Sequence, residues 1–286
     1  MRYAITGATG QLGRLVIDAL LETVPAADVV AAVRDPAKAS DLAAKGVEVR
    51  EADYDRPDTL RTAFEGIGKV LLISSSAVGV REKQHRAAID AAKAAGVELL
   101  AYTSILHADT TPAKLAREHK ATEDAIAASG VPAAILRNGW YTENHLMGLQ
   151  PALEHGAMVG SAGEGRFSSA VRADYAAAAA AVLLSAESQA GQVYELAGDD
   201  GYTLAEFAAE LSRQTGKEIA YRDLPEADYK GVLAGAGLPE ALADALADED
   251  NVARNDTLFD DGRTLSRLID RPTTPMRETV AAALAG

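Results

Sequence analysis

Three glycines stand at equal spacing near the start of the chain, in "AITGATGQLGRLV". They follow an apolar run and open a segment of helical periodicity, in a GxxGxxG pattern. A loop of this kind brings backbone N–H groups at a helix N-terminus close to a pyrophosphate, where the helix dipole favours negative charge. The alternative is a plain turn that needs a positive φ. The strand–loop–helix context favours a dinucleotide clamp made of Gly7, Ala8, Thr9, Gly10, Gln11, Leu12 and Gly13.

The second strand ends in "AAVRDPAKA", which bears on the choice of cofactor. Where an NAD enzyme carries an acid for the ribose hydroxyl, this chain has Arg34, with Lys38 nearby. A planar guanidinium suits a 2′-phosphate, so the sequence predicts NADPH. The alternative is that Asp35 takes the ribose and Arg34 is a surface charge.

Polar side chains follow two further strands. Asp53 and Tyr54 could edge the adenine, and Ser74, Ser75 and Ser76 could hold ribose or phosphate, because ligands bind outside the carboxyl ends of parallel strands. Both groups could equally satisfy the local backbone.

The Tyr/Lys pair that many reductases of this fold use, four residues apart, is missing: no tyrosine has lysine four residues later. The helix where that pair would lie carries His119 and Glu123 instead. These two could form a proton relay, line the nicotinamide pocket, or interact on the surface one turn apart.

The segment "AILRNGWYTENHL" is dense in groups that could border the nicotinamide: Arg137, Asn138, Trp140, Tyr141, Glu143, Asn144 and His145. Trp140 could also be a core residue. Arg172, just before a later helix, could reach a phosphate or be a surface charge.

The elements that position these residues alternate between short apolar strands and amphipathic helices. Strands are expected at 3–6, 29–33, 47–50, 70–73, 99–103, 133–136 and 193–196. This alternation predicts an α/β fold: a doubly wound, Rossmann-like parallel sheet with a smaller, mainly helical C-terminal lobe. The predicted domains are an NADP-binding domain of residues 1–140, completed by about 173–197, and an interleaved substrate lobe of 141–172 and 198–286.

After about Trp140 the alternation breaks: glycine and polar residues fill 156–169, a helix starts near Asp174, and the mostly helical final third contains one strand-like piece, 218–221. The acidic stretch "LADEDNVARNDTLFDDG" is expected to be a solvated loop or helix end.

Composition excludes several classes of function. The net charge of −14 argues against a nucleic-acid partner. With no cysteine and five unclustered histidines, thiolate chemistry and a metal site are not expected. The start of the chain lacks a signal-peptide pattern and the apolar run at 176–184 is too short to cross a bilayer, which favours the cytoplasm without a membrane span.

The motifs "AITGATGQLG", "LLISSS", "AYTS", "LRNGWY.EN", "RADYAAAAA" and "YELAGD" resemble the NmrA-like atypical short-chain dehydrogenase/reductases, most closely their bacterial NADPH:quinone oxidoreductase type 2 branch. The resemblance extends to "LFDDGRTLSRLIDRPTTP" near the C-terminus. It implies hydride transfer from NADPH to a quinone bound between two lobes, without metal or flavin. It also implies cofactor contacts from Gly7–Gly13, Arg34, Ser74–Ser76, Gly139–Asn144 and Arg172.

A quinone is already an electrophile, so orientation and proximity could suffice for hydride transfer. The candidate proton or hydrogen-bond donors are Tyr54, His119 and Asn144. Two other functions stay open: a non-enzymatic NADP(H)-binding redox sensor, and a reductase of another small carbonyl or enone compound. A homodimer also stays open.

Overall fold

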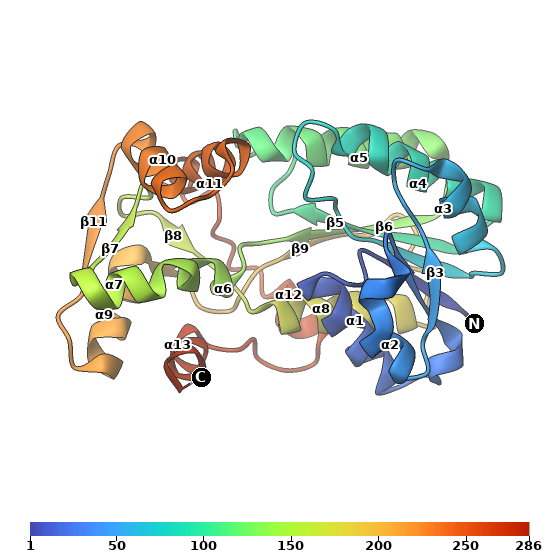
Figure 1. Cartoon of the computed structure of the whole chain (residues 1–286), viewed down its shortest axis with the longest axis horizontal. Coiled ribbons are helices and arrows are strands. Elements are labelled where there is room, and N and C mark those ends of the chain that lie inside the picture. Colours follow the sequence, from blue (N-terminus) through green and yellow to red (C-terminus); the bar gives the residue numbers. More distant parts are fainter. Residues whose placement is uncertain (286) are drawn as a thin grey trace. The chain divides into compact units, whose positions relative to one another are not determined.

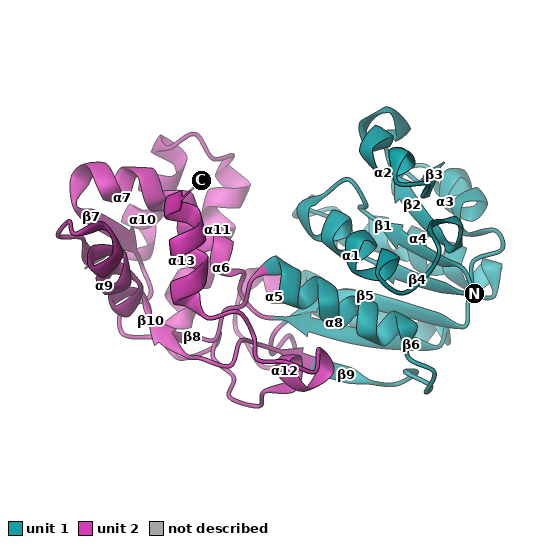
Figure 2. Cartoon of the chain, turned by 90° about the horizontal axis from the view of Figure 1, so that it is seen from below, with its two compact units in different colours: residues 1–105, 118–138, 172–194 teal, residues 106–117, 139–171, 195–286 magenta. Residues whose placement is uncertain are grey.

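The computed structural model describes residues 1–285, which form two compact units (Figure 2). Unit 1 contains residues 1–105, 118–138 and 172–194, and unit 2 contains 106–117, 139–171 and the chain from 195 onward. The predicted domains differ from these units mainly at 106–117, which the prediction placed in the first domain. The two units are interleaved in sequence because the chain leaves unit 1 and returns to it twice.

Unit 1 is built on a seven-stranded sheet with the order β3-β2-β1-β4-β5-β6-β9. Its strands are β1 (Tyr3–Thr6), β2 (Val29–Val33), β3 (Glu48–Glu51), β4 (Lys69–Leu72), β5 (Leu99–Ile105), β6 (Ala133–Asn138) and β9 (Val193–Leu196). The pairings from β3 through β6 are all parallel, with Ile5 beside both Ala31 and Leu71. The strand order reverses between β1 and β4, so the loops after these two strands meet at the switch point where such sheets bind ligands.

Helices cover both faces of this sheet, α1 and α8 on one and α3, α4 and α5 on the other (Figure 1). The helices of unit 1 are α1 (Gln11–Leu21), α2 (Ser40–Ala44), α3 (Pro57–Phe64), α4 (Arg81–Ala95), α5 (Lys114–Ser129), whose start lies in unit 2, and α8 (Arg172–Leu184). The central strands are apolar on both sides because both sides are covered. Ala4, Val30, Val70 and Leu100 are fully buried in one cluster. The doubly wound fold predicted from the sequence is confirmed.

Unit 2 combines helices with two small sheets. Its helices are α6 (Thr142–His145), α7 (Leu149–His155), α9 (Leu204–Thr215), α10 (Glu226–Gly235), α11 (Glu240–Ala253), α12 (Thr264–Leu268) and α13 (Met276–Ala285). Its strands are β7 (Ala157–Gly160), β8 (Arg166–Phe167), β10 (Tyr202–Thr203) and β11 (Ala220–Asp223). β10 pairs antiparallel with β8, and β11 pairs in parallel with β7. The strands β7 and β8 fall in 156–169, where glycine and polar residues gave no strand signal, because their partners lie far along the chain.

The acidic stretch 246–262 departs most from expectation. Its first half belongs to α11, and Asp248, Glu249 and Asp250 are buried there. Backbone N–H groups from distant segments hold two of these carboxylates: Lys114 donates to Asp248 over 2.7 Å and Ser161 donates to Asp250 over 3.0 Å. The expectation of a solvated segment was wrong for these three residues.

The described residues include no helix that is both long and apolar enough to span a bilayer. The alanine-rich run expected to be a buried helix lies in α8, where most side chains are buried.

Candidate cofactor and substrate sites

The glycine loop forms a tight turn after β1. Gly7 has φ +58° and its carbonyl accepts the N–H of Gly10 over 2.8 Å. A Cβ on Gly13 would lie 2.5 Å from the Gly7 carbonyl oxygen and 2.7 Å from the Cα of Ala8, so only glycine permits this packing of α1 on the loop. Gly10 is the N-cap of α1, and no side chain caps the helix there. The backbone N–H groups of the first turn thus form a cradle that fits a pyrophosphate.

Arg14 ties this loop to the segment after β2. Its Nε donates to the carbonyl of Thr9 and its guanidinium donates to the carbonyl of Lys38, each over 3.2 Å, and it pairs with Asp41. Arg14 carries no distinctive sequence signal, since a single arginine in the first turn of a helix fits no motif.

Arg34 and Asp35 have different surroundings. Asp35 accepts the N–H of Ala37 over 3.1 Å and so caps the short 3-10 helix Pro36–Ala39, and its other oxygen lies 3.9 Å from Lys38 Nζ. Arg34 is exposed, and within residues 1–285 it makes no hydrogen bond or ion pair. Its guanidinium is therefore available to a 2′-phosphate, whereas Asp35 is engaged in the turn.

Tyr54 is held within the fold of unit 1. Its hydroxyl lies 2.7 Å from Thr6 Oγ1 and 3.0 Å from the carbonyl of Ile73, and Thr6 Oγ1 also accepts the N–H of Ile73 over 2.9 Å. This cluster joins the ends of β1 and β4. Burial raises the pKa of the Tyr54 hydroxyl. Both properties make it a poor proton donor at neutral pH.

The loop after β4 is fixed by side chains beneath it. Thr103 Oγ1 accepts the N–H of Ser74 over 2.9 Å, and His85 Nε2 accepts the N–H of Ser75 over 2.9 Å. Ser75 Oγ donates to Gln84 over 2.6 Å. The sequence pointed to the serines but missed His85 and Gln84, whose places on α4 mark them only as members of an amphipathic helix.

His119 and Glu123 are buried on α5, so the surface interaction, one of the three alternatives left open by the sequence, is wrong. Arg81 can only donate, so its contact of 3.1 Å makes His119 Nε2 an acceptor and leaves the proton on Nδ1, which lies 2.9 Å from the Tyr102 hydroxyl. Burial, reinforced by the Arg81 charge, holds the pKa of His119 well below its usual value. The imidazole is neutral and both its nitrogens are engaged.

Glu123 has different partners. Arg137 donates to it through Nε over 3.0 Å and through Nη2 over 2.7 Å, and Ser104 Oγ donates over 2.6 Å. This buried group joins α5 to the ends of β5 and β6. Arg137 is thus engaged in an ion pair inside unit 1, and its predicted role in bordering the nicotinamide stays a prediction.

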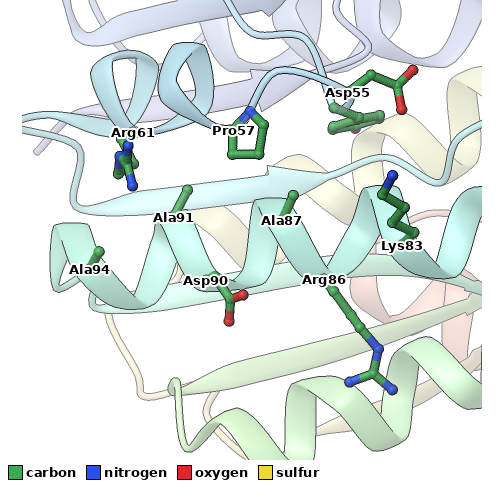
Figure 3. A pocket seen from close by; sticks show the side chains of 10 residues that line it. Asp55, Pro57, Arg61, Lys83, Arg86, Ala87, Asp90, Ala91 and Ala94 are labelled. Atoms are coloured by element: carbon green, nitrogen blue, oxygen red, sulfur yellow. The ribbon is translucent and has the colours of Figure 1, made fainter.

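Unit 1 contains a cavity of about 520 Å³ between α3 and α4, shown in Figure 3. Ala87 and Ala91 of α4 point toward the α3 side, and Lys83 points toward Asp55 (Figure 3). The remaining charged lining residues are Arg61, Arg86 and Asp90. Charges of both signs around small alanines do not suit a flat apolar substrate.

Unit 2 contains a cavity of different character, about 350 Å³ in volume. Apolar side chains from α7, α9, α10, α11 and β7, and from the segments next to α6 and after α10, form most of its wall: Trp140, Met147, Pro151, Ala157, Met158, Val159, Leu204, Val232, Leu233, Ala236, Leu238 and Leu246. Its polar side chains are those of Asn144, His145, Tyr229 and Asp250. An apolar cavity with a few converging polar groups is typical of small-molecule sites. Trp140 packs against the core of unit 2, which was one of its two predicted roles, and it also lines this cavity. Its place beside the nicotinamide stays a prediction.

Backbone hydrogen bonds hold the segment that carries Trp140 and Asn144. Gly139 donates to the carbonyl of Leu196 over 2.7 Å, and Thr142 donates to the carbonyl of Ala170 over 2.9 Å. In return, Ala170 donates to the carbonyl of Trp140 over 3.1 Å. Tyr141 and Glu143 are half-buried in the same segment. Arg172, also half-buried, lies in unit 1 as the first residue of α8.

His145 is the buried aromatic residue of this cavity wall. Its ring packs against Phe167, Tyr202 and Phe207, with centroid distances of 5.0–5.9 Å. Burial lowers its pKa to about 3, so it is neutral. Its Nε2 has no hydrogen-bond partner within the described residues. These residues include no cluster of three or more His, Asp or Glu side chains that could hold a metal ion.

Residues 7–186 match a protein family described as NAD(P)H-binding, a span that begins at the glycine loop and ends just after α8. The chain belongs to this NAD(P)H-binding family. Within the family it is 56% identical to quinone oxidoreductase 2 of Escherichia coli (strain K12), over 97% of both chains. It is also 31% identical to the NAD(P)H azoreductase of Xenophilus azovorans, over 97% of this chain and 96% of that protein.

Solved structures extend this result to the fold of the NAD(P)H-binding chain. It superposes with a TM-score of 0.96 on the NADPH complex of the NADPH-dependent quinone oxidoreductase QOR2 from E. coli, at 55% identity over 99% of both chains. The NADP(H) complex of a Citrobacter triphenylmethane reductase gives a TM-score of 0.93 at 38% identity, over 98% of this chain and 99% of that one. The family resemblance inferred from the motifs is confirmed.

Proposed function

We propose that this protein is an oxidoreductase that transfers a hydride from NADPH to a quinone without a metal or flavin. The main structural support for this proposal is the apolar cavity of unit 2. Its size and its few polar groups suit a quinone ring. The 56% identity to quinone oxidoreductase 2 over nearly the whole chain supports the same substrate class.

The residues of unit 1 fit the cofactor. The N–H groups at the start of α1 would bind the pyrophosphate, Arg34 would bind the 2′-phosphate, and the loop Ser74–Ser76 would contact the remaining part of the dinucleotide. When bound, NADPH supplies the hydride. The family resemblance also assigns Gly139–Asn144 and Arg172 to the cofactor, and these contacts stay predictions.

The residues of unit 2 would orient the quinone and exclude water from it. Trp140 and the aliphatic wall bury its ring, which strengthens polar interactions inside the cavity. The amide N–H groups of Asn144 can donate a hydrogen bond to the oxyanion that forms as the hydride adds. Of the three donors that the sequence suggested, Asn144 is the one that lines this cavity.

The test is NADPH oxidation, followed by absorbance with and without a simple benzoquinone. We expect quinone-dependent oxidation and formation of the hydroquinone in equal amounts. Tight NADPH binding with no oxidation by any quinone would instead indicate a redox sensor. A parallel panel of an azo dye and a triphenylmethane dye distinguishes a quinone reductase from a reductase of other acceptors.

We also propose that the protein is located in the cytoplasm and acts on a small molecule. A homodimer, which the sequence left open, is part of the proposal. Subcellular fractionation checks the location, and sedimentation velocity of the purified protein measures the oligomeric state.

A further inference from the structure

We propose that Asp250 is the proton donor that completes quinone reduction in the unit 2 cavity. This inference rests on the proposed function and adds the acid that the sequence did not reveal. A quinone that accepts a hydride becomes a hydroquinone monoanion, which needs one proton. Asp250 lies on α11 in the stretch expected to be solvated, yet its side chain is 5% exposed and lines the cavity.

The two oxygens of Asp250 have different surroundings. Oδ2 accepts the backbone N–H of Ser161 over 3.0 Å, which holds this oxygen against the chain. Gly160 makes room for this contact, because a Cβ there would lie 2.8 Å from Oδ2. Oδ1 makes no hydrogen bond within residues 1–285 that would compete for a proton. The geometry presents a fixed acid with one oxygen free for the substrate.

The protonation state fits this role. Burial raises the pKa of Asp250 to about 6, with a further increase from the charge of Asp223, and against the lowering effects of the Ser161 N–H and Arg254. Arg254 makes two hydrogen bonds of 2.8 Å to Asp223, so its charge is largely paired. Asp250 therefore holds its proton at a higher pH than an ordinary aspartate, whose pKa is 3.8, and a minority of the molecules still carry it at neutral pH.

The other titratable groups that face Asp250 are neutral. Burial raises the pKa values of Tyr229 on α10 and Tyr221 on β11, which keeps both hydroxyls protonated. Glu249, the preceding residue, has a pKa raised to about 8 by burial and by its acidic neighbours. His145 is neutral, as described above. Among the groups that line the cavity, Tyr229 is too weak an acid and Asn144 has no acidic proton, so Asp250 is the best donor.

The proposed step balances. The hydride carries an electron pair from NADPH to the quinone, whose carbonyl oxygen becomes an oxyanion. The O–H bond of Asp250 breaks, a new O–H bond forms on that oxyanion, and Asp250 is left as a carboxylate that still accepts the Ser161 N–H. Water returns a proton to Asp250 before the next turnover. The sum is quinone, NADPH and one proton giving hydroquinone and NADP⁺.

The experiment compares Asp250→Asn with the wild-type protein. Asparagine keeps the shape and the acceptor for Ser161 but has no proton to transfer. We expect kcat with benzoquinone to fall on the order of 100-fold. KM for the quinone and Kd for NADPH should stay within about threefold, because the cavity and the unit 1 site keep their form.

The pH profile separates proton donation from a structural role. The protonated acid is the active form, so wild-type kcat should fall as pH rises from about 5 to about 8. This fall should be absent from Asp250→Asn. Glu249→Gln is the matched control, because it removes the neighbouring buried carboxyl on the same helix without altering the cavity wall. It should keep the wild-type profile below about pH 7.

A pair of quinones tests the same step in the wild-type protein, without relying on any variant. Dimethyl- and dichloro-benzoquinone substituted at the same positions have similar volumes, but the dimethyl hydroquinone anion is the stronger base and depends more on a donor. We expect the ratio of dimethyl to dichloro kcat to fall as Asp250 ionises above about pH 6.

Wild-type activity in Asp250→Asn with an unchanged pH profile would overturn the proposal. A ratio of the two quinones that does not change with pH would also overturn it. If the wild-type protein oxidised NADPH with no quinone, the proposed function itself would be wrong. That result would be obtained before any variant is made.

Discussion

Arg34 is the residue on which the choice between NADPH and NADH depends. The turn after β2 engages Asp35, whereas Arg34 is exposed and makes no hydrogen bond or ion pair within the described residues. A charge-assisted hydrogen bond to a phosphate is worth about 1.5–3 kcal/mol. We expect Arg34→Ala to weaken NADPH binding roughly 10- to 100-fold and to leave NADH binding within about twofold. Titration of both cofactors by fluorescence measures the two dissociation constants.

Lys38→Ala is the matched control for this prediction. Lys38 is also exposed and cationic, but it lies 3.9 Å from Asp35 and its charge is partly satisfied. The substitution Lys38→Ala should therefore weaken NADPH binding less than Arg34→Ala does. If Arg34→Ala lost NADPH and NADH affinity equally, Arg34 would not bind the 2′-phosphate.

Gly10 and Gly13 lie in the same loop but should respond differently to substitution. A Cβ at Gly13 would press on backbone atoms at 2.5–2.7 Å, so Gly13→Ala should lower the free energy of unfolding by about 1–3 kcal/mol. At Gly10 the nearest atom would be the Gly7 carbonyl oxygen at 3.1 Å. Gly10→Val should therefore spare most of the stability and block close approach of the pyrophosphate.

Urea denaturation and NADPH titration of these two variants give a direct comparison. If Gly10→Val bound NADPH as well as the wild-type protein, the loop would be only a turn.

At the scale of elements, the sequence predicted the helices and strands that local residue patterns determine. Most strands of the main sheet contain short apolar runs, such as VVAAV in β2, although β3 reads EVRE. The helix α4 ends at Gly96, which has φ +66°. The short strands β7 and β8 were missed because their stability comes from pairing with β11 and β10, tens of residues away. The buried acids of α11 were missed for a related reason: their charge pattern suggests solvent, and the backbone donors that satisfy two of them lie elsewhere in the chain.

The burial of Glu249 in α11 predicts a pH-dependent stability. Its folded-state pKa is about 8, raised from 4.5, so the folded protein holds this proton more tightly than the unfolded chain does. Its contribution is fully present below about pH 4.5 and is lost as pH rises through about 8. The free energy of unfolding should fall with a slope of up to about 1.4 kcal/mol per pH unit across this window. Urea denaturation at several pH values measures the slope.

Glu249→Gln should flatten this dependence above about pH 6, because glutamine has no proton to lose. Below that pH the remaining slope comes from Asp250, whose folded-state pKa is also raised. An unchanged slope in Glu249→Gln would mean that Glu249 does not carry a raised pKa in the folded protein.

At the scale of the whole molecule, the proposed function assigns different tasks to the two units. Unit 1 carries the glycine loop and Arg34, and unit 2 carries the apolar cavity and Asp250, each with a hydrophobic core of its own. Each ligand should therefore slow hydrogen exchange in a different set of peptides, because binding stabilises the backbone that it contacts.

Hydrogen exchange followed by mass spectrometry tests this division. NADPH alone should protect 7–13 and 74–76 in unit 1, together with 139–144 if the family's cofactor contacts hold here. A non-reducible aromatic analogue of the quinone, added alone, should protect the segments that line the unit 2 cavity, 147–159 and 229–250, and leave 7–13 unchanged. Protection of 7–13 by the analogue would contradict the assignment of the quinone to unit 2. Because protection needs no turnover, the result locates the two ligands independently of the catalytic role of Asp250.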